Sequence, residues 1–153
     1  MQKLDLARIP KRRGSDYPPP FDREPASRVR QRLGDAGGLT QFGVNLIELP
    51  PGAWSSQRHW HTEEDEFVFV VSGEAVLITD DGEEILRAGD CAAFPRNSRV
   101  GHHLVNRSTM TAVCLEVGSR CASDAAYYPD IDMIFDPVIG WYTRQDGTPY
   151  PRK

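Results

Sequence analysis

The stretch RHWHTEEDEFVFVVSGE, residues 58–74, decides the fold of this chain because it joins a pair of histidines to a strongly apolar run. His59 and His61 are two positions apart, so on an extended segment their side chains point to the same side. On a helix this spacing would splay the two imidazoles apart. The residues TEED at 62–65 suit an exposed turn, and the apolar run at 66–72 predicts a strand. We therefore expect two extended segments joined by a turn.

Glu66 follows His61 by five positions, an odd step that would turn it to the opposite face of an unbroken strand. A turn at 62–65 resets this alternation, so the expected inward-pointing residues are Glu66, Val68 and Val70. The expected outward-pointing residues are Phe67, Phe69 and Val71. Both sets are apolar beyond the glutamate, so the outward face should be covered by the N-terminal arm, the C-terminal tail or another subunit.

Short strand-forming runs separated by turn residues occupy the middle of the chain. They lie at residues 39–49, 66–73, 74–90, 89–95, 101–108 and 110–119. Asp81-Gly82 stands between two alternating runs and is a strong hairpin signal. Regularly spaced short strands without a convincing long amphipathic helix predict an all-β sandwich or barrel.

The chain divides into three parts by composition. Residues 1–26 form a basic and proline-rich N-terminal arm, residues 27–118 hold the predicted barrel, and residues 119–153 form an aromatic and proline-rich extension. We expect the extension to pack on the barrel or on a partner subunit. The run SRVRQRL at 27–33 is compatible with a short helix or with an edge strand, and we prefer the strand.

With 153 residues, 39% hydrophobic and 26% charged, the chain has the size and composition of one globular domain. A net charge of −4 offers no basic face for nucleic acid, and the short Lys11-Arg12-Arg13 cluster is read as part of a solvated arm. No apolar run approaches the length of a membrane span, and no secretory signal is visible, so we expect a cytoplasmic protein. The three cysteines should be reduced thiols, with Cys91 and Cys114 in the core.

Histidines occur in this chain only as two close pairs, His59 with His61 and His102 with His103. Two imidazoles and the inward Glu66 aimed into one cavity form a ligand set that zinc, iron, manganese, nickel and copper all accept. A lone histidine pair is more often a surface feature, but the glutamate and the second pair favour a metal site. The acids Glu63, Glu64 and Asp65 are read as a solvated turn.

At this point the sequence resembles the cupin superfamily. Its first motif is matched, with one extra residue in the first gap, by Gly52, His59, His61, Glu66 and Gly73. Its second motif is matched by Gly89, Pro95, His102 and Asn106. The departure lies between Pro95 and His102, where Asn97 stands in place of a glycine and the spacing is two residues longer. The arm and the tail also look like a group of small bacterial cupins, some of them labelled sugar-phosphate isomerases by analogy.

The resemblance implies a jelly-roll barrel that binds one divalent metal through His59, His61, Glu66 and His102. Strand alternation alone cannot choose between His102 and His103, and the spacing to Asn106 favours His102. His103 is then expected at the surface or at an interface. Family habit and the two-sided apolar strands also predict a homodimer.

Four protein ligands leave one or two metal positions for water or an oxygen-bearing substrate. We expect a metal-dependent enzyme of the isomerase, decarboxylase or dioxygenase type that acts on a sugar, a sugar phosphate or an organic acid. The alternatives are a non-catalytic binding or sensor protein and a purely structural metal site. Next to the first motif, Gln57 and Arg58 are mainly read as strand surface, and Tyr127 and Tyr128 as packing aromatics.

Overall fold

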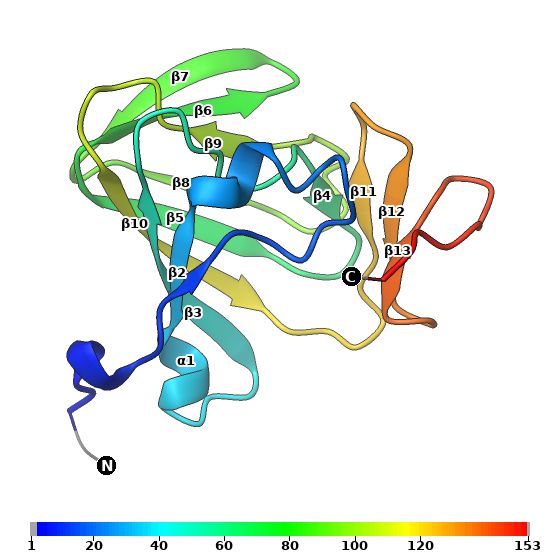
Figure 1. The fold of residues 1–153 in the computed structure, drawn as a ribbon, viewed down its shortest axis with the longest axis horizontal. Coiled ribbons are helices and arrows are strands. Elements are labelled where there is room, and N and C mark those ends of the chain that lie inside the picture. Colours follow the sequence, from blue (N-terminus) through cyan, green and yellow to red (C-terminus); the bar gives the residue numbers. More distant parts are fainter. Residues whose placement is uncertain (1–2, 153) are drawn as a thin grey trace.

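The computed structural model describes residues 3–152 (Figure 1). The helical elements are the 3-10 helices η1 (Leu6–Arg8) and η2 (Glu24–Ser27) and the α-helix α1 (Leu33–Ala36). The strands are β1 (Arg12–Arg13), β2 (Val29–Arg32), β3 (Phe42–Leu49), β4 (Trp60–His61), β5 (Glu66–Ser72), β6 (Glu74–Thr79), β7 (Gly82–Arg87), β8 (Cys91–Phe94), β9 (His103–Val105), β10 (Ala112–Ser119), β11 (Ala126–Tyr128), β12 (Met133–Asp136) and β13 (Trp141–Thr143). The expected all-β fold is confirmed, and the preference for a strand over residues 27–33 is borne out by β2.

The largest sheet has the strand order β1-β2-β3-β10-β5-β8, with antiparallel neighbours throughout. In β5 the burial alternates as expected, because Val68 and Val70 are buried while Phe67, Phe69 and Val71 are 39%, 37% and 50% exposed. The bend at 62–65 therefore resets the alternation as the sequence indicates. No other part of the described chain buries these three apolar side chains.

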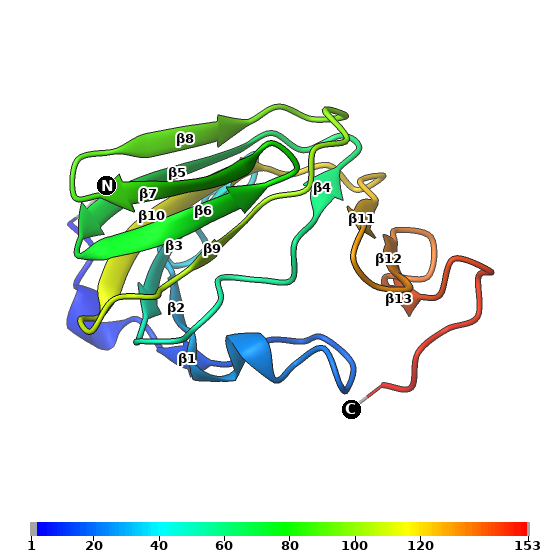
Figure 2. The same cartoon turned by 90° about the horizontal axis from the view of Figure 1, so that it is seen from above.

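A second sheet, β7-β6-β9, lies opposite the first and encloses the core with it (Figure 2). The hairpin at Asp81-Gly82 joins β6 to β7 as predicted, with Gly82 at a φ of +127°. Inward-facing side chains of both sheets form one buried cluster: Ile47, Leu49, Ala53, Val68, Val70, Ala75, Leu77, Leu86, Leu104, Ala112 and Cys114. The two sheets are not joined into a continuous ladder, so the jelly roll is an open sandwich.

The C-terminal extension forms a third sheet, β13-β12-β11-β4, at one end of the jelly roll (Figure 1). Its strand β11 pairs with β4, which places Ala126 opposite His61. A second buried cluster joins the extension to the N-terminal arm and consists of Tyr17, Ala126, Tyr128, Met133 and Tyr150. The extension and the Tyr17 segment of the arm therefore pack together at the end of the molecule that carries the first histidine pair.

The cysteines follow the sequence expectation only in part. All three are free thiols, and Cys114 is buried in the core. The placement of Cys91 in the core is wrong, because β8 is an edge strand and Cys91 faces the exposed side beside Phe69. Among the described residues, no helix has both the length and the apolar character needed to cross a membrane.

Candidate metal centre

Three separate chain segments bring the four predicted ligands together. His59 forms an isolated antiparallel bridge with His102, His61 ends β4, and Glu66 begins β5. The Glu66 Oε2 atom lies 2.8 Å from Nε2 of His102 and 3.5 Å from Nε2 of both His59 and His61. One carboxylate oxygen thus faces three imidazole nitrogens of the same type.

The opposite nitrogen of each imidazole faces a hydrogen-bond acceptor. Nδ1 of His59 lies 2.9 Å from the Gln57 carbonyl oxygen, and Nδ1 of His102 lies 3.5 Å from the Val100 carbonyl oxygen. Nδ1 of His61 lies 2.6 Å from the Asp124 carboxylate. Because carbonyl and carboxylate oxygens accept, each Nδ1–H can donate to its partner, and each Nε2, which faces Glu66, is the nitrogen that would bind a metal ion once it has lost its proton.

The ionisation of the site reflects burial and the close packing of opposite charges. Burial raises the pKa of Glu66, but hydrogen bonds from His102 and His59 outweigh it and hold the pKa well below the usual range. Burial lowers the pKa of His61, but the hydrogen bond to Asp124 and the charge of Glu66 raise it above the usual value. Burial lowers the pKa of His102 more than Glu66 raises it. The carboxylate is therefore ionised and ready to bind a cation.

Asp124 is a site residue that the sequence analysis missed. Its Oδ1 accepts hydrogen bonds from the backbone N–H groups of Glu63 and Glu64 at 2.8 and 3.2 Å, and its Oδ2 faces His61. With these contacts Asp124 fixes the bend at 62–65 and orients the His61 ring. A lone aspartate in the aromatic tail carries no sequence signal for this role.

Glu64 is not the solvated turn residue that the sequence suggested. Its Oε1 accepts a hydrogen bond from the Cys121 N–H at 2.7 Å, and burial raises the pKa of the carboxyl. His61, Glu64 and Asp124 form a second group of potential ligand atoms behind the first. The backbone contacts of Asp124 identify this group as support for His61 rather than as a separate metal site.

His103 corrects another expectation, because it is buried rather than at the surface. Its Nδ1 lies 3.0 Å from the Ser56 carbonyl oxygen, and its ring packs edge-on against Trp54 at 4.6 Å. Of the second histidine pair, it is His102 whose Nε2 reaches Glu66. The structure therefore brings His102, and not His103, to the cluster of facing nitrogens.

Two neighbouring cavities are lined by Glu66 of the cluster. The inner one has a volume of about 40 Å³ and is lined by residues that include His59, Glu66, His102 and Glu116. The outer one has a volume of about 210 Å³, and its lining includes Arg30, Glu66 and Glu116. Glu66 and Glu116 belong to both linings, so the two cavities are neighbours that share these residues.

Aromatic rings hold the imidazoles in place. Phe94 stacks on His102 with ring centroids 3.7 Å apart, and Tyr128 stacks on His59 at 5.6 Å. Tyr127 instead stacks on Trp60, which points away from the cluster. Of the tyrosine pair that the sequence assigned to packing, Tyr128 thus packs directly against a predicted ligand.

The neighbours of the first motif serve packing and ion pairing. Gln57 is buried and donates to the Phe21 carbonyl oxygen at 2.8 Å. Arg58 pairs with Asp130 at 2.6 Å and with Asp80. The Gln57 side chain is therefore hydrogen-bonded, and the Arg58 side chain ion-paired, to other residues of this chain.

The loop that departs from the family pattern contains a left-handed residue. Asn97 has a φ of +55°, a conformation that asparagine tolerates better than most residues other than glycine. Its N–H donates to the His61 carbonyl oxygen at 2.7 Å. Asparagine at this position thus keeps the backbone turn beside His61.

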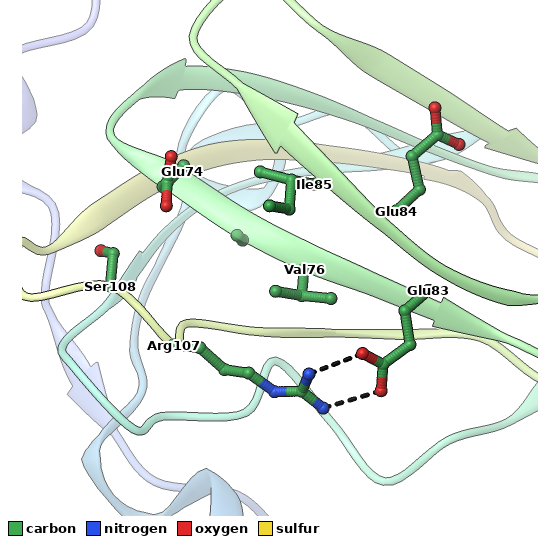
Figure 3. A pocket seen from close by; sticks show the side chains of 8 residues that line it. Glu74, Val76, Glu83, Glu84, Ile85, Arg107 and Ser108 are labelled. Atoms are coloured by element: carbon green, nitrogen blue, oxygen red, sulfur yellow. Dashed lines mark hydrogen bonds and ion pairs between the residues drawn. The ribbon is translucent and has the colours of Figure 1, made fainter.

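A larger hollow lies away from the histidines, between β6, β7 and the loop after β9 (Figure 3). It has a volume of about 460 Å³, and its charged lining residues include Glu83 and Arg107, which form a two-pronged ion pair at 2.6 and 2.8 Å. Glu74 and Glu84 add further acids to the lining. This hollow contains no imidazole or thiol and has no chemical connection with the cluster.

The donor set matches a borderline divalent metal. Three neutral imidazole nitrogens and one carboxylate are ligands that zinc, iron, manganese and nickel accept. Within residues 3–152, the donor atoms of His59, His61 and Glu66 lie within 4.8 Å of one another. The oriented Nδ1–H groups add the outer hydrogen bonds that metal-bound histidines ordinarily make. The residues present therefore fit a divalent metal.

Comparisons with known proteins agree with this geometry. A profile of the Cupin domain family matches residues 45–118. A crystal structure of a cupin-superfamily sugar phosphate isomerase from Silicibacter pomeroyi is 50% identical, with a TM-score of 0.92, and the alignment covers 98% of this chain and 97% of the other.

Two further solved structures share the fold. A protein provisionally assigned as a sugar phosphate isomerase from Acidithiobacillus ferrooxidans is 32% identical over 84% of this chain and 83% of its own, with a TM-score of 0.74. A protein predicted to be an oxalate decarboxylase from Thermotoga maritima is 19% identical over 78% of this chain and 100% of its own, with a TM-score of 0.64. No curated protein sequence matches the chain. The family profile and the 50% identity over nearly the full length show that this chain belongs to the cupin superfamily.

Proposed function

We propose that this cupin is a metal-dependent enzyme that acts on a small oxygen-bearing substrate, a sugar phosphate or an organic acid. The observation that carries the proposal is the convergence of three imidazole Nε2 atoms on Oε2 of Glu66 beside a cavity. The metal ligands would be His59, His61, Glu66 and His102. The relatives named for sugar-phosphate isomerisation support the choice of substrate class.

The chain supplies a rigid and partly dry setting for this chemistry. A bound divalent metal polarises a carbonyl or hydroxyl oxygen of the substrate, or acidifies a bound water. Asp124 and the Gln57 carbonyl hold two imidazoles in orientation, and Phe94 covers the face of His102. Glu116 lines both cavities, and burial raises its pKa, so this carboxyl retains a proton to a higher pH than an ordinary glutamate. Glu116 is thus placed to exchange a proton with a substrate in the cavity.

The test combines elemental analysis with a turnover assay. The purified protein should contain close to one equivalent of a first-row transition metal, and His59→Ala should remove it. The wild-type protein, loaded in turn with zinc, iron, manganese or nickel, is then offered sugar phosphates, hydroxy acids and keto acids. Conversion that disappears in His59→Ala supports an enzyme. Metal binding without any conversion would instead favour a non-catalytic binding protein.

We also propose that the protein is a homodimer. The exposed apolar side chains of Phe67, Phe69 and Val71 lie side by side on one face of the largest sheet and support this proposal. A contiguous apolar patch of this kind is typical of a protein–protein contact. A second copy of the chain would cover the face that the arm and the tail leave exposed.

A further inference from the structure

Three arginines lie on one face of strand β2 and its leading residue. Arg28, Arg30 and Arg32 alternate with the buried Val29 and Gln31. The pairing of β2 with β3 sets Arg30 opposite Ile47 and Arg32 opposite Asn45, and β10 continues these rows with Cys114 and Glu116. Ile47 and Cys114 are core residues, so Arg28 and Arg30 lie on the inward face of the sheet, while Arg32 lies at its exposed rim.

The guanidinium of Arg30 has no counter-ion in contact with it. Across the described part of the chain, its side chain makes no hydrogen bond and no ion pair, although it lies in the lining of the outer cavity. Burial and the neighbouring charges of Arg28 and Arg32 lower the pKa of Arg30, whereas the negative charge of Glu116 raises it. Because burial also raises the pKa of Glu116, this carboxyl is a weaker counter-ion than an ordinary glutamate.

The outer cavity also carries the carboxyl groups of Asp35, Glu64, Glu66 and Glu116, but none of them forms an ion pair with Arg30. The two flanking arginines have partners of their own. Arg28 is buried and donates only to the carbonyl oxygens of Ser55 and Gly14, and its Nε has no partner. Arg32 reaches Asp35 at 3.6 Å, but Asp35 also pairs with Arg120. Arg30 is half-buried and lines an open cavity, so its unpaired guanidinium is accessible to an anionic ligand.

The position of Arg30 relates this charge to the metal centre. The outer cavity that Arg30 lines shares Glu66 and Glu116 with the inner cavity, and Glu66 faces the three Nε2 atoms. A small molecule in the outer cavity could therefore present one end to Arg30 and an oxygen to the metal. Planar guanidinium groups bind carboxylate and phosphate through paired, charge-assisted hydrogen bonds.

We propose that Arg30, with Arg32 beside it on β2, forms an anion subsite that binds the phosphate or carboxylate group of the substrate in the outer cavity. The inference rests on the proposed function and deepens it, since it requires the substrate to be an anion and assigns the residue that recognises its charge. Neutral sugars and simple alcohols are then poor substrates.

The test measures anion binding separately from metal binding. The full-length protein is treated with chelator and titrated calorimetrically with inorganic phosphate and, in a second arm, with acetate. Arg30→Met should weaken the binding of the preferred anion by about ten- to a hundredfold, because it removes charge-assisted hydrogen bonds. Arg30→Lys keeps the positive charge but loses the paired N–H donors of the guanidinium, so it should retain part of the anion affinity. This variant replaces Arg30→Met in the test if Arg30→Met does not fold. The anion that binds more tightly identifies the substrate group.

A matched control is Arg107→Met, which removes an arginine of the hollow beside β6 and should leave anion affinity unchanged. Zinc affinity should be the same in Arg30→Met as in the wild type, whereas His59→Ala should lose zinc and still bind the anion. Failure of both anions to bind the wild-type protein, or equal binding by wild type and Arg30→Met, would overturn the subsite. Neither of those results would affect the metal centre, so the two proposals fail independently.

Discussion

The Asp124 carboxylate lies 2.6 Å from Nδ1 of His61, although 63 positions of sequence separate the two residues. This contact connects the C-terminal extension to the candidate metal centre, because Asp124 lies just before β11 and His61 belongs to β4. The extension thus contributes directly to the geometry of a predicted ligand. In many metal sites such an outer carboxylate fixes the ring and increases the basicity of the coordinating nitrogen.

Asp124→Asn should therefore weaken zinc binding by about ten- to a hundredfold, as other changes of outer-shell partners do. The amide keeps the shape of the side chain but loses the charge that favours His61 as a ligand. Zinc affinity is measured by competition with a chromogenic chelator. Asp132→Asn is the matched control, since the Asp132 carboxylate accepts a hydrogen bond from the Gln145 N–H in the same extension and contacts no histidine. Equal zinc affinity in the two variants would contradict the role of Asp124.

The adjacent residues His102 and His103 should respond differently to substitution. His102→Ala removes an Nε2 that faces Glu66, so zinc retention should be lost while the protein stays folded. His103→Ala should retain zinc but lower the free energy of unfolding by about 1–3 kcal/mol, because it leaves the buried Ser56 carbonyl without its partner. Metal content and urea unfolding of both variants provide the comparison. Loss of zinc in His103→Ala alone would reverse the assignment.

The exposed apolar face of the largest sheet, which carries Phe69, leads us to expect a dimer that a charge at this position would disrupt. Phe69→Asp places a charge in the middle of the apolar face and should convert the proposed dimer to a monomer, as measured by light scattering after size-exclusion chromatography. The matched control is Val138→Asp, since Val138 is 91% exposed on the loop between β12 and β13. The control should remain dimeric. A wild-type protein that is already monomeric would refute the dimer.

The free thiols should differ in reactivity. Burial raises the pKa of Cys114 to about 12, so at pH 8 only about one thiol in ten thousand is ionised, and thiolate is the reactive form. Titration of the native protein with a chromogenic disulfide reagent should therefore give the same number of reactive thiols for wild type and Cys114→Ser. The difference of one equivalent should become visible only after unfolding in denaturant. Rapid modification of Cys114 in the folded protein would show that the core opens readily.

Several features followed from local residue patterns. The period-two alternation in β5 and the Asp81-Gly82 hairpin were sufficient to predict an all-β fold. The histidine pairs and Glu66 indicated a metal site, and the choice of His102 as the fourth ligand came from the resemblance to the cupin motif. These signals are local because a strand alternates with a fixed period and a tight turn needs particular residues. The bend at 62–65 could also be read from composition, and it placed Glu66 correctly on the inward face.

Other features required the pairing of distant segments. Cys91 is exposed because β8 lies at the edge of the sheet, and His103 is buried because Trp54 and Ser56 pack against it. Neither the order of strands in a sheet nor the neighbours of a loop can be read from the local pattern. The same limit explains why Asp124 was missed and why Glu64 was placed in solvent.

The sequence by itself determined the strands of the jelly roll, the turn and the residue types able to bind a metal, because these depend on backbone periodicity and side-chain chemistry within a few positions. Only the tertiary structure decided that Asp124 supports His61 and that Arg30 faces the outer cavity without a counter-ion. Those relationships depend on strand register and on the docking of the extension, where side chains far apart in the chain meet and exclude water.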